Sequence, residues 1–214
     1  MKTKILFATA LLATSLCFSC DYFKTTSKDP VVDENPDLAL NTPPEMSGTK
    51  IQVALLLDTS NSMDGLIDQA KSRLWNIVNT LTTLKYEGKN PTIEIALYEY
   101  GNDGLSASTN FIRQVTPLST DLDLISEKLF SLRTNGGNEY CGAVIQDATK
   151  KLEWGSEKGN MKLLYIAGNE EFSQGPISYK EVINDALKKD IYVNTIFCGN
   201  NSEGINSKWK DGAD

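Results

Sequence analysis

The chain has 214 residues, of which 40% are hydrophobic and 23% charged, so it is long enough for one substantial domain and an additional segment. Its net charge is −7 and its lysines and arginines form no stripe, which argues against nucleic-acid binding. It contains no histidine, so a Ser-His or Cys-His nucleophile within the chain is excluded.

The first twenty residues have the pattern of an export signal. A positively charged start precedes a mostly apolar run, residues 5–16, that is too short to span a bilayer. Ser19-Cys20 then resembles the processing site of bacterial lipoproteins, so we expect loss of residues 1–19 as a signal peptide and lipidation of Cys20. Ordinary secretory cleavage nearby is the alternative. The expected location is extracytoplasmic, anchored to a bacterial membrane on its periplasmic or cell-surface side.

Residues 20–48 are rich in proline and in polar and acidic side chains, with little apolar periodicity. This composition is typical of a disordered tether. The composition changes at Thr49, where we expect a folded domain to begin and to occupy residues 49–214.

Within this domain, apolar runs of strand length alternate with helical patterns. The apolar runs predict five strands, at residues 51–57, 92–100, 111–116, 161–167 and 191–197. Helical spacing and capping signals predict four helices, from Leu66 to Leu84, from a Thr120-x-x-Asp123 cap to about Leu132, after the 133–142 loop to about Trp154, and from a Ser178-x-x-Glu181 capping box to about Lys189.

This order of elements predicts an α/β fold, doubly wound around a mostly parallel sheet with helices on both faces. The second and third strands are joined by too few residues for a parallel crossover, so the third strand is expected to be antiparallel and at an edge.

Three oxygen-bearing side chains follow the first strand directly. Asp58, Ser60 and Ser62 lie at the carboxyl end of a buried strand, where open α/β sheets place their binding sites. At alternate positions of a tight loop their oxygens can converge on one point, and such hard ligands suit Mg²⁺, Mn²⁺ or Ca²⁺. The alternative is that a serine caps the next helix and Asp58 favours its N-terminus.

The Asp-x-Ser-x-Ser pattern after an apolar strand resembles the metal-ion-dependent adhesion site (MIDAS) of von Willebrand factor type A (VWA) domains. The resemblance covers about residues 50–200. The loop Asn-Gly-Gly-Asn-Glu-Tyr-Cys-Gly resembles a bacterial lipoprotein subgroup of this family. The resemblance implies a VWA/Rossmann-like fold with a bound divalent cation, Mg²⁺ or alternatively Mn²⁺ or Ca²⁺. Because the family's sheet carries a sixth strand and a closing helix, we expect the domain in this sequence to lack both.

In the family two further loops complete the metal site, and both differ here. Where a threonine is usual, a glycine pair is followed by Asn138 and Glu139. Where the fourth strand usually ends in Thr-Asp-Gly-Glu, this chain has Ala-Gly-Asn-Glu. An ungapped alignment puts Gly168 at the aspartate position, and a shift of one residue puts Asn169 there, beside Glu170. The four polar residues of these loops are candidate metal ligands, and the alternatives are surface acids and turn residues.

Two cysteines, Cys141 and Cys198, are expected near the same sheet edge. Outside the cytoplasm they could form a disulfide. The alternative is two buried free thiols.

The resemblance implies a module that binds a divalent cation and a protein partner rather than an enzyme. A site of neutral hydroxyls leaves the cation electron-poor, so a partner could supply an acidic side chain, whereas direct binding by Glu139 or Glu170 would reduce that need. A metal-free assembly or scaffold subunit is one alternative, favoured by the altered loops. An enzyme on a similar α/β fold is another, although neither G-x-G-x-x-G nor G-x-x-x-x-G-K-[ST] is present.

Overall fold

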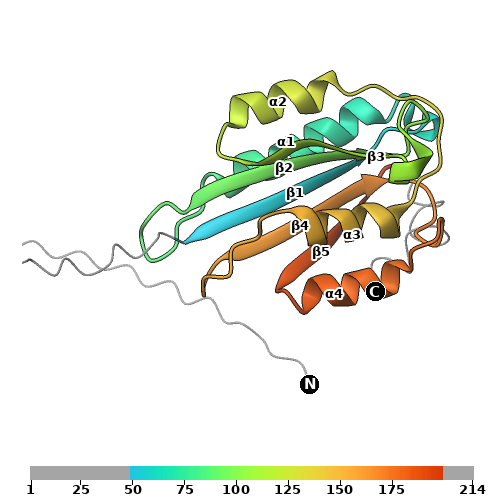
Figure 1. The fold of residues 1–214 in the computed structure, drawn as a ribbon. Helices are drawn as coiled ribbons and strands as arrows, with labels where there is room; N and C mark the ends of the chain where they lie inside the picture. The colour runs from blue at the N-terminus through green and yellow to red at the C-terminus, as the bar shows by residue number, and fades with distance from the viewer. Residues whose placement is uncertain (1–48, 200–214) are drawn as a thin grey trace, which may run out of the picture. The chain divides into compact units, whose positions relative to one another are not determined.

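The computed structural model describes residues 49–199, which form a five-stranded sheet with two helices on each face (Figure 1). The strands are β1 (Lys50–Asp58), β2 (Thr92–Tyr100), β3 (Ile112–Ser119), β4 (Met161–Gly168) and β5 (Ile191–Phe197). The helices are α1 (Ile67–Leu81), α2 (Leu122–Ser131), α3 (Cys141–Lys151) and α4 (Tyr179–Leu187), with short 3₁₀ turns η1 (Asn61–Met63) and η2 (Ala107–Thr109). Between residues 49 and 199 no helix combines the length and the apolar character that crossing a membrane requires.

The sheet has the spatial order β3-β2-β1-β4-β5. Strand β1 is central and pairs in parallel with both β2 and β4, and β4 pairs in parallel with β5. Strand β3 pairs antiparallel with β2 at one edge. The doubly wound fold and its antiparallel edge strand are therefore confirmed. Because the chain leaves β1 toward β2 and later returns on the other side as β4, a topological switch point lies beside the carboxyl end of β1.

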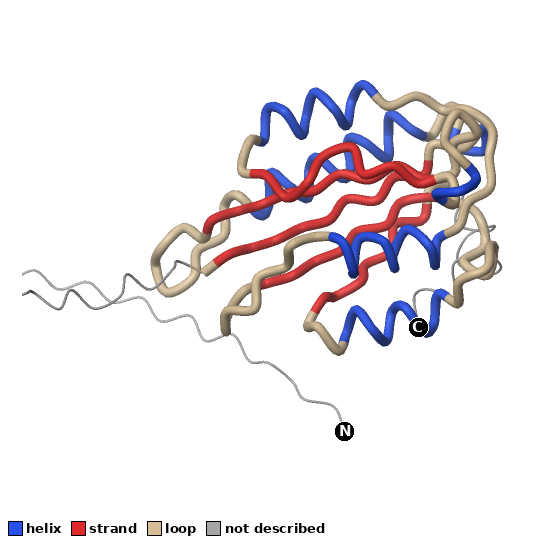
Figure 2. Tube along the Cα trace, in the orientation of Figure 1, coloured by secondary structure: helices blue, strands red, loops and turns tan. Residues whose placement is uncertain are grey.

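Strand β1 is buried on both faces because helices cover both sides of the sheet (Figure 2). Its alternate side chains enter two separate cores. Ala54 and Leu56 pack with α3 and α4, whereas Leu55 and Leu57 pack with α1 and α2. This two-sided burial explains why β1 reads as a continuous apolar run instead of an alternating one.

The helix boundaries differ from the sequence predictions at three points. Helix α1 ends at Leu81, three residues before the predicted Leu84. The N-cap of α2 is Asp121, whose Oδ1 accepts from the Leu124 amide at 2.9 Å, so the predicted cap at Thr120 is wrong by one residue. Helix α3 ends at Lys151, and the Trp154 indole folds back to donate to the Ala148 carbonyl at 3.0 Å. The predicted cap of α4 is confirmed, since the Ser178 hydroxyl accepts from the Glu181 amide.

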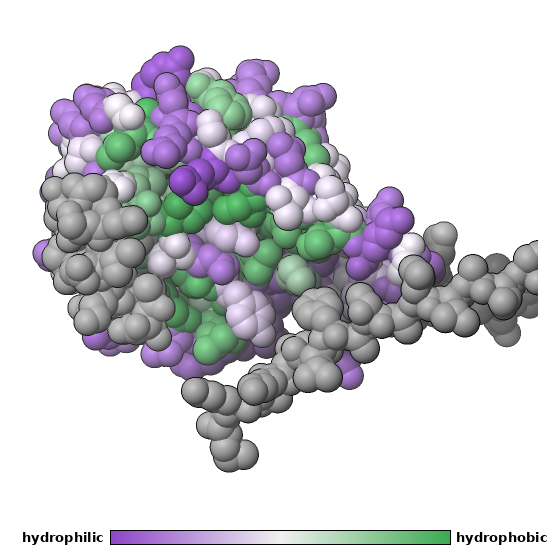
Figure 3. Space-filling view, turned by 180° about the vertical axis from the view of Figure 1, so that it is seen from behind, coloured by the Kyte–Doolittle hydropathy of each residue, from purple (hydrophilic) through white to green (hydrophobic). Residues whose placement is uncertain are grey.

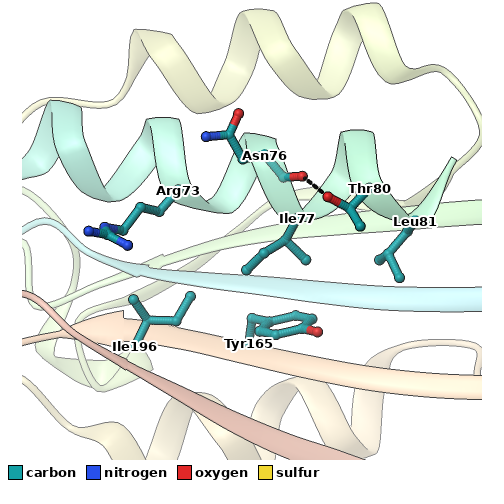
Figure 4. Close-up of a pocket in the computed structure, with 7 residues that line it drawn as sticks. All are labelled: Arg73, Asn76, Ile77, Thr80, Leu81, Tyr165 and Ile196. Atoms are coloured by element: carbon teal, nitrogen blue, oxygen red, sulfur yellow. Dashed lines mark hydrogen bonds between the residues drawn. The ribbon is translucent and has the colours of Figure 1, made fainter. Parts of the chain in front are cut away.

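The α1 side of β4 and β5 carries a groove. Apolar side chains gather on the face seen in Figure 3. Figure 4 shows the groove between α1 and the two strands, where Ile77 and Leu81 face Tyr165 and Ile196 and the polar residue Arg73 lies at one end.

Candidate metal centre

Asp58 is the last residue of β1 and is completely buried. Its Oδ1 accepts a hydrogen bond from the Ser60 backbone amide at 2.8 Å, which folds the chain tightly after the strand. Its Oδ2 is buried and has no hydrogen-bond partner within the described part of the chain. A buried carboxylate oxygen without a partner is costly, so its presence at a sheet edge indicates that something else satisfies it.

The two serines converge beside this carboxylate. The Oγ atoms of Ser60 and Ser62 are 2.9 Å apart, with Ser60 buried and Ser62 exposed. Ser60 stands at the N-cap of η1, but its side chain makes no capping hydrogen bond, and α1 begins after Leu66 without a side-chain cap. Helix capping therefore does not account for these hydroxyls, and their oxygens are grouped as the MIDAS resemblance implies.

The loop after β4 contributes Asn169. Its Oδ1 accepts from the Ser62 hydroxyl at 2.7 Å, and its Nδ2 donates to the Ser62 carbonyl at 3.0 Å. Gly168, by contrast, is packed so closely that a Cβ there would lie 2.5 Å from the Tyr100 hydroxyl and 3.0 Å from Asp58 Oδ2. No side chain fits at Gly168, so the structure brings Asn169, one position later, to the site.

The loop before α3 is fixed to the β1 loop by its backbone. The Asn135 amide donates to the Thr59 carbonyl at 2.9 Å, and the Gly136 amide donates to Asn61 Oδ1 at 2.9 Å. A Cβ on Gly137 would lie 1.8 Å from the Gly101 carbonyl oxygen, so this contact requires glycine.

The two polar residues that follow this glycine pair differ in their exposure. Asn138 is exposed, whereas Glu139 is 7% exposed and turns toward Asp58 and Ser60. The structure therefore places Glu139 in the site and leaves Asn138 at the surface. Glu170 lies close enough to the site for its charge to act on both Asp58 and Glu139.

Burial dominates the electrostatics of the site. It raises the pKa of Asp58 to about 7, against the hydrogen bonds from Ser60, and the charges of Glu139 and Glu170 raise it further. Burial also raises the pKa of Glu139, opposed by hydrogen bonding that includes Ser60 and Gln174. No lysine or arginine within residues 49–199 forms an ion pair with Asp58 or Glu139.

These donors suit a hard cation. The described residues contain no group of three or more His, Cys, Asp or Glu side chains that could hold a metal ion, so any site here mixes carboxylate, hydroxyl and amide oxygens. Such oxygens match Mg²⁺, Mn²⁺ or Ca²⁺ better than a metal that prefers sulfur or nitrogen. The orphaned Oδ2 of Asp58 and the adjacent hydroxyls of Ser60 and Ser62 therefore fit the cation that the MIDAS resemblance implies.

Sequence reasoning missed the close-packed glycines that shape this site. Gly101, directly after β2, lies against Asp58, and Gly168 lies against its other carboxylate oxygen. The sequence pattern that could have identified them is a glycine at, or directly after, the carboxyl end of each of the two strands that flank β1. Tyr98 and Tyr100 are fully buried, so they pack in the core and do not form a binding face.

The structure does not form the disulfide expected between Cys141 and Cys198. Both are buried free thiols. Cys141 packs in the core beneath α3 and α4, whereas Cys198 packs in the core beneath α1 and α2. The two residues share a sheet edge but lie on opposite faces, so the predicted pairing is wrong in this structure. Cys20 lies outside the described residues.

The fold and the oxygen-lined loop after β1 define a doubly wound α/β domain with a site at its topological switch point. Residues 52–205 match the sequence profile of the von Willebrand factor type A domain. The chain belongs to the von Willebrand factor type A family. A comparison with curated protein sequences finds no match.

Solved structures with this fold include proximal thread matrix protein 1 from the mussel byssus, with a TM-score of 0.54 and 14% identity over 76% of this chain and 40% of that one. A second structure of that protein, described as having a zinc-occupied MIDAS motif, has a TM-score of 0.52 and 13% identity. The pilus adhesin SpaC from Lactobacillus rhamnosus GG, in an open conformation, has a TM-score of 0.51 and 12% identity over 69% of this chain and 24% of that one. This chain thus spans less than half the length of each, and such low identities show a shared fold alone.

Proposed function

We propose that the chain is an extracytoplasmic, membrane-tethered VWA module that binds a divalent cation and, at that cation, a protein partner. One observation carries the proposal. Asp58 is a fully buried carboxylate at the carboxyl end of β1, and its Oδ2 has no partner among residues 49–199. VWA domains commonly mediate metal-dependent protein interactions, and a similar structure is described with zinc in its MIDAS motif.

Four residues would hold the cation. Asp58 supplies a carboxylate, Ser60 and Ser62 supply hydroxyl oxygens, and Asn169 supplies an amide oxygen at the rim. We favour Mg²⁺ or Mn²⁺, with Ca²⁺ as the alternative, because all these donors are hard oxygens. A bound cation would provide an attachment point for an oxygen of the partner. The surrounding backbone holds the donors in place.

The export pattern supports membrane tethering. A lipid on Cys20 and the 20–48 segment would hold the folded domain away from the membrane surface. These residues lie outside the described part of the chain. We propose binding rather than catalysis because the chain lacks histidine and the common phosphate-binding glycine motifs, and because its site presents oxygen ligands.

Calorimetric titration of the full chain with Mg²⁺ and Mn²⁺ tests the metal. Asp58→Ala should abolish binding, whereas Ser60→Ala and Ser62→Ala should weaken it less because water can replace a neutral oxygen. Asp123→Ala, which removes an exposed carboxylate in the first turn of α2, is the matched control and should bind as wild type does. If wild type binds no divalent cation at millimolar concentration, the metal-free assembly subunit becomes the better account.

Chemical crosslinking in native membranes tests the partner. Crosslinked products of the wild-type chain should disappear when EDTA is added and should be missing for Asp58→Ala. Products that persist under both conditions would point to assembly without a metal.

A further inference from the structure

We propose that Glu139 is a second carboxylate ligand supplied by this chain, so that the partner reaches the cation through a neutral oxygen, such as an amide carbonyl or a hydroxyl. This inference rests on the proposed function. It assigns Glu139 the position at which the family resemblance would place a threonine, and it specifies the chemistry of the partner.

The position of Glu139 is fixed from both sides. On one side, Gly137 rests on the Gly101 carbonyl so closely that no side chain fits between them. On the other side, the Cys141 amide donates to the Glu139 carbonyl at 3.1 Å, where α3 begins. The Glu139 backbone is therefore held between a glycine contact and a helix start, which keeps its side chain at the site.

Glu139, Asp58 and Ser60 border the same point in space. A Cβ built on Gly101 would lie 2.9 Å from Asp58 Oδ1, 3.1 Å from Glu139 Cγ and 3.5 Å from Ser60 Cβ. The side chains of two acidic residues and one serine therefore lie around Gly101. These side chains come from two segments, the end of β1 with the loop after it and the loop before α3, and Gly101 itself lies directly after β2.

The charges at this point lack a counter-ion. Glu99, on the neighbouring strand, shows the usual arrangement: it is 3% exposed and pairs with Arg113 at 2.6 Å. Asp58 and Glu139 are also buried but form no ion pair with a lysine or arginine of residues 49–199. Two like charges in a desolvated site repel each other, so one cation bound between them would satisfy both.

The unpartnered Oδ2 of Asp58 is the independent sign of a ligand. It is buried against Gly168, whereas Oδ1, which accepts from the Ser60 amide, is the oxygen that lies on the Gly101 side, beside Glu139. The acidic groups alone would not identify a site, but a fully buried carboxylate oxygen with no donor requires one.

The number of carboxylates that this chain supplies to the cation determines which kind of oxygen a partner can add. With Asp58 alone, a divalent cation keeps one positive charge and attracts a carboxylate from outside. With Asp58 and Glu139 both bound, the cation is neutralised within the chain, and Glu170 adds further negative potential nearby. A third carboxylate from a partner would then be repelled, whereas a neutral oxygen would not.

Chemical rescue tests this assignment on the full chain. The affinity for Mn²⁺ is measured by calorimetry in sodium chloride and in sodium acetate of equal ionic strength, after correction for Mn²⁺–acetate association. Wild type should bind equally well in both salts. Glu139→Ala should bind about tenfold more weakly in chloride, and acetate should recover part of the loss by occupying the vacated carboxylate position.

Two further variants complete the experiment. Glu139→Gln keeps the size of the side chain and should also weaken binding, so a folding defect of the alanine variant would not hide the effect. Glu171→Ala removes an exposed carboxylate two residues after Asn169 and should behave as wild type.

Each result separates the inference from the proposed function. If wild type binds Mn²⁺ and both Glu139 variants match Glu171→Ala, the Glu139 assignment is overturned while the metal site stands. If acetate tightens binding to wild type, the neutral-oxygen partner is overturned, since the cation then accepts an external carboxylate. If wild type binds no Mn²⁺, the proposed function fails and the inference fails with it.

Discussion

Ser62 and Asn169 hold each other through two hydrogen bonds, one in each direction. The Ser62 hydroxyl donates to Asn169 Oδ1 at 2.7 Å, and Asn169 Nδ2 donates to the Ser62 carbonyl at 3.0 Å. Since a serine hydroxyl has one proton, this bond leaves its lone pairs free to accept or to bind a cation. The pair joins η1 to the loop after β4, residues that are 107 positions apart in the chain.

This relationship predicts the effect of Asn169→Asp. The carboxylate keeps an acceptor for the Ser62 hydroxyl and adds a negative charge at the rim of the site. We expect Mn²⁺ to bind about tenfold more tightly, equivalent to about 1.4 kcal/mol. Titration calorimetry measures the affinity, with Asn138→Asp as the control because Asn138 is exposed on the loop before α3. An affinity that is unchanged or lower would mean that Asn169 braces Ser62 without binding the cation.

The two core cysteines should remain reduced after export. Cys141 and Cys198 are buried on opposite faces of the sheet, and burial raises the pKa of both thiols, so they are poor nucleophiles in the folded protein. Alkylation of membrane-extracted protein should be slow until denaturant is added and then label both residues without a reductant. Mass spectrometry of the peptides reads out the result, and a peptide joining the two cysteines would contradict it.

Local patterns were enough to predict the strands and the first metal loop. Strand β1 is a continuous apolar run because helices cover both of its faces, whereas β4 and β5 are less buried but each still carries several apolar residues over the length of a strand. Asp58, Ser60 and Ser62 could be grouped because their convergence depends on alternate spacing within five residues. Within the loop, the Ser60 amide bonds to Asp58 and the two hydroxyls lie side by side. Distant segments then fix the loop through Asn169, through the loop before α3 and through the glycines packed against Asp58.

Features that depend on contacts between distant segments could not be predicted. The sequence placed Cys141 and Cys198 at one sheet edge but carried no information on which face each would occupy. It also left Glu139 open between a surface acid and a ligand, since its burial depends on Gly137 packing against Gly101. The α2 cap differed for a local reason: Asp121 and Thr120 are both acceptable caps, and backbone geometry selects between them.

A buried lysine offers a test of how α1 and α2 are held together. The Lys71 side chain is 1% exposed, and its Nζ donates to the Leu132 carbonyl at the end of α2 at 2.8 Å. Lys71→Met keeps the length of the side chain but leaves this carbonyl without its donor, which should cost about 1–3 kcal/mol in the free energy of unfolding. Urea denaturation measures the loss.

The matched control removes the other partner of Lys71. Asp68 accepts from the same Nζ at 3.3 Å but is 90% exposed, so Asp68→Asn should change stability little. Equal losses for both variants would show that the surface ion pair, and not the bond to Leu132, matters.

The stability of the metal-free protein should fall as the pH rises. Burial raises the pKa of Asp58 from its ordinary value of 3.8 to about 7 in the folded state. The folded chain therefore holds a proton that the unfolded chain releases at lower pH. The contribution of Asp58 to the free energy of unfolding is complete below its pKa in the unfolded chain. It is lost as the pH rises through its pKa in the folded chain. Because one pKa unit corresponds to about 1.4 kcal/mol, the loss for wild type should reach a few kcal/mol.

Asp58→Asn isolates this contribution, since asparagine cannot ionise while the neighbouring acids Glu139 and Glu170 remain in both proteins. Urea unfolding in EDTA, from about pH 5 to about pH 8, should show wild type losing stability relative to the asparagine variant. Mn²⁺ added at the high end of this range should restore wild type and leave the variant unchanged, because the site requires the ionised Asp58 carboxylate to hold the cation. Parallel stability profiles in EDTA would mean that Asp58 is ionised in the folded protein at every pH tested, and that its charge is already compensated without a metal.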